Sequence, residues 1–176
     1  MGTKRVGLAR TQALIENLKR DLAMGGTRFT NVKGVELVKH SALTTIPVAV
    51  GSTDMSITLP KNAFVTDVGF INTAILGATS GGTTVSIMAG WDSAGAVDVI
   101  ASTAVCDANS AAVAEAGFSA ASGKKGDASG AAMSLVDGGV FYRTSSDTMY
   151  MRVTIGTAVQ DQISYGYMYV KYFLLP

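Results

Sequence analysis

The strictest constraint on this chain is a two-residue alternation of apolar and polar side chains that begins after residue 34. It is clearest in MYMRVTI, residues 149–155, where Met, Met, Val and Ile alternate with Tyr, Arg and Thr. Side chains repeating with period two point to opposite faces of a β-strand. Further candidate strands lie at 35–38, 45–50, 56–59, 64–71, 84–88, 97–100, 139–143 and 163–173.

These candidate strands are separated by residues that favour turns, and no crossover helix is predicted between them. We therefore expect a mainly β fold over residues 35–176, an antiparallel β-sandwich of jelly-roll type. In the strand over 64–71, Phe64, Val68 and Phe70 are predicted to face inward. Residues 107–134 are rich in Ala, Gly and Ser with little periodicity, which predicts a long low-complexity loop.

The N-terminal segment, residues 1–34, has a different pattern. Leu14, Ile15, Leu18 and Leu22 form a helical stripe, and Gly25-Gly26 is a typical helix stop. A helix is predicted over about 9–24. Because the stripe is narrow, this amphipathic helix is expected to pack on one surface as an arm outside the sandwich.

Charge separates the arm from the rest of the chain. Residues 1–40 hold eight basic and three acidic side chains, a net charge of +5, while the remaining residues carry −4. This asymmetry predicts a basic docking arm on a mildly acidic body. Charged residues are only 15% of the chain, which suits either a surface largely covered by partners or a small β-domain with a Ser/Thr surface.

No pattern of catalytic, metal-binding or cofactor-binding residues stands out. Cys106 and His40 are single residues in different segments, so a nucleophile and base pair is not supported. The stretch 117–125 departs from a P-loop because Lys125 replaces the Ser or Thr that holds magnesium. The Asp residues are scattered beside turn-forming residues. We expect no enzyme, no metal, no cofactor and no small-molecule substrate. No apolar stretch is long enough to span a membrane.

Aromatic residues supply the remaining candidates for binding. Tyr165, Tyr167 and Tyr169 share one face of the last predicted strand, and Trp91 is the only tryptophan. Either group could stack on a sugar, but alternating Tyr and a lone Trp are more typical of a packed face or a subunit contact. They are therefore predicted as subunit-interface residues of a homo-oligomer.

Three stretches resemble structural proteins of tailed marine bacteriophages. KRVGLARTQALIENLKRDLAMGG resembles the N-terminus of small virion proteins, SITLPKNAFVTDVGFINTA a pattern of phage structural β-domains, and MYMRVTIGTAVQDQISYGYMYVKYF the last hairpin of such domains. The resemblance implies a capsid decoration (cement) or accessory virion protein. Such a protein is made in the host cytoplasm, binds the major capsid protein on the capsid exterior, often as a trimer, and stabilises the shell.

The residues expected to dock the arm on the capsid are its apolar stripe and its cations: Lys4, Arg5, Arg10, Leu14, Ile15, Leu18, Lys19, Arg20 and Leu22. The main alternative is a tail-fibre or receptor-binding module, in which Trp91 and the 107–134 loop would contact a host glycan. A small hydrolase and a nucleic-acid-binding internal virion protein are further alternatives. Nucleic acid is disfavoured because the basic segment lacks interleaved aromatic residues and a recognition helix.

Overall fold

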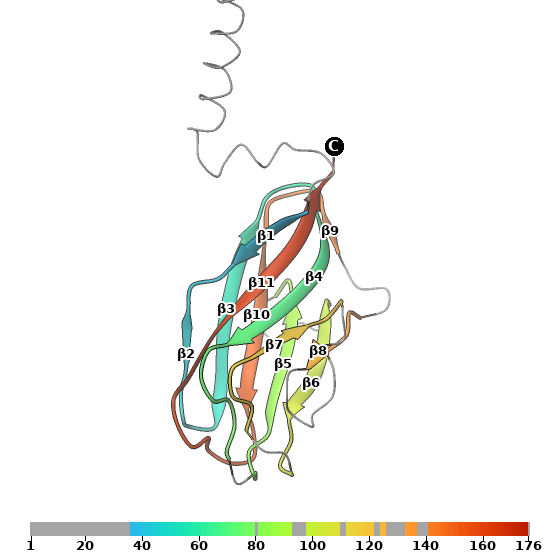
Figure 1. Ribbon diagram of the computed structural model, residues 1–176. Coiled ribbons are helices and arrows are strands. Elements are labelled where there is room, and N and C mark those ends of the chain that lie inside the picture. Colours follow the sequence, from blue (N-terminus) through green and yellow to red (C-terminus); the bar gives the residue numbers. More distant parts are fainter. Residues whose placement is uncertain are drawn as a thin grey trace, which may run out of the picture.

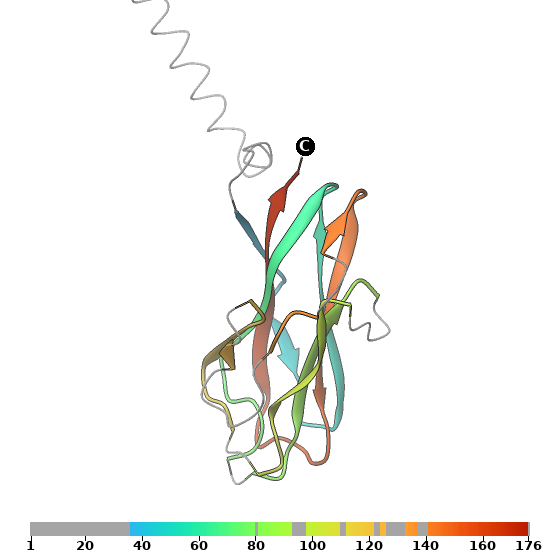
Figure 2. The same ribbon diagram turned by 90° about the vertical axis from the view of Figure 1, so that its right-hand side faces the viewer.

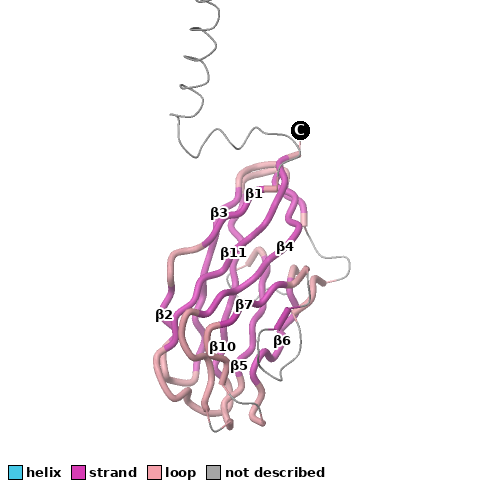
Figure 3. The backbone as a smooth tube through the Cα atoms, in the orientation of Figure 1, coloured by secondary structure: helices cyan, strands magenta, loops and turns pink. Residues whose placement is uncertain are grey.

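The computed structural model describes residues 36–79, 81–92, 98–109, 112–121, 124–125, 133–136 and 141–175. They form two antiparallel β-sheets packed face to face as a sandwich (Figures 1 and 2). The mainly β prediction is confirmed. The described chain consists of strands and connecting loops (Figure 3), with no helix that could cross a membrane. The predicted arm, with all its candidate docking residues, lies outside the described residues.

Sheet A follows the order β1-β11-β4-β7-β8, with β2 also paired to β11 and β9 to β4. Its strands are β1 (Leu37–His40), β2 (Thr44–Ile46), β4 (Ala63–Asn72), β7 (Ala116–Ser119), β8 (Lys124–Lys125), β9 (Tyr142–Arg143) and β11 (Ser164–Leu174). Sheet B follows the order β3-β10-β5-β6. Its strands are β3 (Gly51–Leu59), β5 (Val85–Gly90), β6 (Ile100–Cys106) and β10 (Asp147–Ile155).

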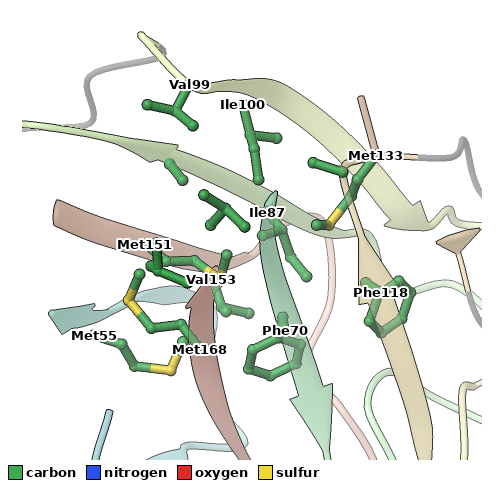
Figure 4. Close-up of a cluster of buried hydrophobic side chains, with 14 of the residues drawn as sticks. Met55, Phe70, Ile87, Val99, Ile100, Phe118, Met133, Met151, Val153 and Met168 are labelled. Atoms are coloured by element: carbon green, nitrogen blue, oxygen red, sulfur yellow. The ribbon is translucent and has the colours of Figure 1, made fainter. Parts of the chain in front are cut away.

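The core lies between the sheets and is rich in methionine. Inward side chains of β10 are buried at every second position, as the alternation predicts. Figure 4 shows Met55, Met151, Met168 and Met133 gathered with aliphatic side chains from both sheets. Phe70 and Phe118 pack against each other with ring centroids 6.2 Å apart. Flexible thioether side chains fill irregular gaps between two twisted sheets, which explains their number here.

A β-bulge in β4 corrects one sequence prediction. Lys171 pairs with Asp67 and Tyr172 with Val65, so Thr66 is an extra residue on β4. An extra residue reverses the direction of the side chains on one side of it. Val68 and Phe70 are therefore buried as predicted, whereas Phe64 faces outward and is 39% exposed.

Two glycines let aromatic rings lie across neighbouring strands of sheet A. A Cβ at Gly69 would overlap the ring of Tyr169 on the outer face, and a Cβ at Gly166 would overlap the ring of Phe70 on the inner face. Rings that pack over glycines in this way fix the register of the paired strands, here β4 and β11. The pairing of β11 with β4 is thus held from both faces.

The segment 107–134, predicted as a loop, contains two short strands, β7 and β8. Within it, β7 pairs with β4 through Gly69–Ser119 to Asn72–Ala116, and β8 pairs with β7. Val113, Phe118 and Met133 are completely buried in the core. The sequence predicted neither strand because small residues hide the alternation, and pairing with β4 decides the conformation.

Candidate docking surfaces

The outer face of sheet A carries the tyrosine row. Tyr165, Tyr167 and Tyr169 alternate along β11 with the buried residues Gly166, Met168 and Val170. The structure therefore brings these three predicted residues together on one outward face. Tyr165 is the most open of the three at 40% exposure, and the other two are half-buried.

Next to Tyr169, a buried carboxylate organises a polar hollow of about 440 Å³. Asp67 is 3% exposed and accepts hydrogen bonds from Ser119 Oγ at 3.0 and 2.8 Å, from the Ala121 amide at 2.8 Å and from the Tyr169 hydroxyl at 3.2 Å. Lys171 Nζ lies 3.5 Å from the same carboxylate. Burial raises the pKa of Tyr169, and the negative charge of Asp67 adds to the rise. The tyrosine is therefore a neutral donor in this network at physiological pH.

A second hollow, of about 480 Å³, lies beside Tyr167. His40 contacts Tyr167 edge-on with ring centroids 5.8 Å apart. The hollow is lined by His40, Ser41, Ala42, Leu43, Thr73 and Tyr167. Leu43 is 61% exposed. This arrangement suits contact with an apolar side chain of a partner better than proton transfer, because no acid is among the lining residues.

The outer face of sheet B has the opposite character. Its hydroxyls bond to one another across strands, with Ser52 Oγ 2.9 Å from Thr154 Oγ1 and Thr58 Oγ1 3.0 Å from Thr148 Oγ1. Arg152 donates to both oxygens of Asp54 at 2.7 and 2.8 Å. The Ser/Thr surface that the low charge suggested is therefore found on sheet B, whereas sheet A has an aromatic outer face.

Trp91 lies apart from the tyrosine row. It follows β5 of sheet B, is only 7% exposed, and has Arg143 Cζ 4.8 Å from its ring centroid. An indole in this position anchors the core and leaves little surface for a sugar. The structure therefore does not group Trp91 with the other interface candidates.

The described side chains that were considered for catalysis do not form a site with one another. Cys106 is fully buried and lies 3.7 Å from the Thr83 carbonyl oxygen. Burial and then Asp107 raise the pKa of the Cys106 thiol, which disfavours the nucleophilic thiolate. Within stretch 117–125, Phe118 and Ser119 of β7 pair antiparallel with Lys125 and Lys124 of β8, which differs from the strand-to-helix turn of a P-loop. Among the described residues, no group of three His, Cys, Asp or Glu side chains could hold a metal ion.

A third surface was not predicted from the sequence. The loops before β3 and before β11 expose Val50, Val159 and Ile163 at 55%, 56% and 47%, next to Tyr165 at the start of β11. We call these four residues the apolar tip. The loops before β3 and β11 lie at the end of the sandwich opposite to the end of β11 (Figure 1). Strand patterning could not reveal them, because they belong to irregular segments.

Gln160 holds the apolar tip in place. Its side chain is 1% exposed and accepts hydrogen bonds from the Gly77 amide at 3.1 Å and from Ser164 Oγ at 3.2 Å. It donates to the carbonyl oxygens of Ile46 at 3.2 Å and Pro47 at 2.8 Å. One side chain thus joins β2, β11 and two loops.

Comparisons with known proteins give limited information. No protein-family model and no curated protein matches the chain. A chain of the cyanophage Pam1 capsid asymmetric unit is similar in structure at 17% identity and a TM-score of 0.44, over 82% of this chain and 89% of that one. A chain of the acidic stable capsid structure of Helicobacter pylori bacteriophage KHP30 is similar at 14% identity and a TM-score of 0.37, over 80% and 94%. At these values neither similarity establishes a family or a function.

Proposed function

We propose that this chain is a virion structural protein, a decoration (cement) protein that binds the outside of the capsid shell and stabilises it. The observation that carries the proposal is the contrast between the two outer faces. Sheet B carries cross-strand hydroxyl pairs and one ion pair, with half-buried Tyr150 and Met88 among them, while sheet A presents a row of three tyrosines, exposed apolar side chains and two hollows. Exposed apolar surface gathered on one face is typical of a protein-binding surface.

The topology supports the same class of protein. The orders β1-β11-β4-β7 and β3-β10-β5-β6, with the chain crossing repeatedly between sheets, are those of a jelly roll. Jelly rolls occur in viral capsid and lectin domains. The resemblance of the sequence to phage structural proteins favours the capsid role over the lectin role.

In the proposed mechanism the N-terminal arm anchors the protein on the major capsid protein, and the tyrosine row joins copies into a homo-oligomer, with a trimer favoured. Burying Leu14, Ile15, Leu18 and Leu22 would contribute about 1.5–3 kcal/mol each before ordering costs. The cations of the arm suit an acidic shell surface. Many copies on one shell would make release slow through avidity.

Deletion of residues 1–26 tests the anchor. Shells without this protein are mixed with full-length or truncated protein and sedimented, and bound protein is quantified. We expect the truncated protein to remain folded, by circular dichroism, and to stay in the supernatant. A matched pair separates the stripe from helix content: Leu18→Ser should weaken binding, and Asn17→Ser on the polar face should not. Undiminished binding of the truncated protein would refute the anchor.

A tail module that binds glycan is the second candidate, because jelly rolls also build lectins and Tyr167 and Tyr169 border two hollows. The burial of Trp91 removes one of its supports. Binding on a glycan array that disappears with Tyr167→Ala would favour this candidate, as would particle density for the protein at the tail only.

A further inference from the structure

The apolar tip is a rigid surface. Besides its four side-chain hydrogen bonds, Gln160 donates its backbone amide to the Val48 carbonyl oxygen at 3.1 Å. Val159 directly precedes Gln160, and Ile163 directly precedes Ser164, which bonds to Gln160, so neither side chain can turn inward without disturbing buried hydrogen bonds. Preorganised exposed apolar side chains lower the ordering cost of binding, which is typical of a docking surface.

The tip also carries a fixed negative charge. Asp161 accepts hydrogen bonds from the Thr79 amide at 2.7 Å and from Thr79 Oγ1 at 2.5 Å. These bonds lower the pKa of the carboxyl, so it stays ionised through mildly acidic pH. The loops 47–50 and 156–163 contain no Lys, Arg or His. A partner for this surface therefore needs an apolar stripe flanked by cations.

The sequence of this chain contains such a segment. The predicted helix over 9–24 has the stripe Leu14, Ile15, Leu18 and Leu22, with Lys19 bordering it on one side and Arg10 and Asp21 on the other. We propose that the apolar tip of one copy binds the segment 9–24 of a second copy, with Lys19 beside Asp161.

The position of the arm favours a neighbouring copy over folding back within one chain. Leu37 pairs with Tyr172, at the far end of β11 from Ile163. Nine residues of strand separate these points, roughly 30 Å. The connecting residues 25–35 span at most about 36–40 Å when fully extended. Folding back is within reach of that length but requires the chain to run back along the sandwich, whereas an arm that reaches a neighbour carries no such constraint.

This inference rests on the arm of the proposed function and adds a contact for it. In free protein the apolar stripe would be covered by the neighbouring copy, and on the shell the same stripe would be transferred to the major capsid protein.

The test uses purified full-length protein without shells. A tagged Leu18→Cys protein is mixed with an equal amount of Ile163→Cys protein, and oxidised glutathione is added. The control replaces Ile163→Cys by Ser56→Cys, which is exposed on sheet B. We expect a disulfide-linked heterodimer of Leu18→Cys and Ile163→Cys at several times the control yield. A yield equal to the control would overturn the proposal.

Two further outcomes also decide it. In sedimentation velocity at one protein concentration, Ile163→Ser should lose the association through segment 9–24 and sediment more slowly than Gln162→Ser, an exposed neighbour, because an oligomer formed by the tyrosine row is common to both variants. Equal association of both variants would overturn the proposal, as would a single chain carrying both cysteines that forms only internal disulfides at high dilution. Because no shell is present, a protein that crosslinks as expected but fails to sediment with shells would refute the proposed function alone.

Discussion

Replacing Gln160 with alanine removes one side chain that holds four groups together. In the folded protein the Gly77 amide, the Ser164 hydroxyl and the carbonyl oxygens of Ile46 and Pro47 all bond to it. Ser164 keeps a second partner, the Ile75 carbonyl oxygen. The substitution breaks all four bonds. Ser164 still has another partner, but the Gly77 amide and the carbonyl oxygens of Ile46 and Pro47 lose this one, so three bonds count toward the cost.

The expected cost follows from these bonds. A net contribution of about 0.5–1.5 kcal/mol for each gives a loss of roughly 3 kcal/mol in the free energy of unfolding. For an ordered body of this size the melting temperature should fall by about 10 °C. The same substitution should also loosen the apolar tip, because Val159 is next to Gln160 and Ile163 is next to Ser164, one of the partners of the deleted side chain.

The assay is urea unfolding followed by far-ultraviolet circular dichroism, with thermal melting as a second measure. Gln162→Ala is the matched control, since Gln162 lies in the same loop and is exposed. The control should change the free energy of unfolding by less than about 0.5 kcal/mol. If Gln160→Ala and Gln162→Ala were equally stable, the hydrogen-bond network would not hold the loop, and the rigidity of the tip would be refuted.

Three further predictions concern stability. Gly166→Ala should lower the free energy of unfolding by about 1–3 kcal/mol, because the new methyl group meets the Phe70 ring; urea unfolding measures this, and an unchanged midpoint would contradict the close packing. The hydrogen bonds of Asp161 lower its pKa, so they stabilise the protein above its ordinary value of 3.8 and are lost as pH falls through the folded value. Asp161→Asn should flatten the acid side of a plot of melting temperature against pH, and a slope equal to wild type would refute this. Burial raises the pKa of Tyr172, so its contribution is present below about pH 10 and is lost as pH rises through the folded value. Tyr172→Phe should lose less stability than wild type above about pH 10, and equal losses would show that this hydroxyl does not titrate late.

The strands with bulky alternating side chains could be predicted from sequence alone. β10 was expected over 149–155 and spans Asp147–Ile155, and β11 was expected over 163–173 and spans Ser164–Leu174. Alternation is a local property, since each side chain needs only its two neighbours to define a face. The shared face of the tyrosine row followed from the same pattern.

β6 and β7 show where this reasoning stops. β6 is IASTAVC, mostly small residues, and β7 is AGFS within a low-complexity stretch. Their side chains define no clear apolar face, so their extended conformation depends on pairing with β5 and β4. The candidate site divides in the same way: Tyr165, Tyr167 and Tyr169 were found from the pattern, whereas Asp67 and Gln160 were not.

From the sequence alone it followed that the chain after residue 34 forms strands with one apolar and one polar face. It also followed that the positive charge is concentrated near the N-terminus, and that Tyr165, Tyr167 and Tyr169 share one face of a strand. Only the tertiary structure decided that Phe64 faces outward, that Trp91 is buried, and that Gln160 fixes an exposed apolar tip. The physical reason is how far apart along the chain the residues lie that determine each property. The direction of successive side chains is set by neighbouring peptide units, whereas a bulge, the burial of one ring and the partners of one amide depend on strands far apart in the chain.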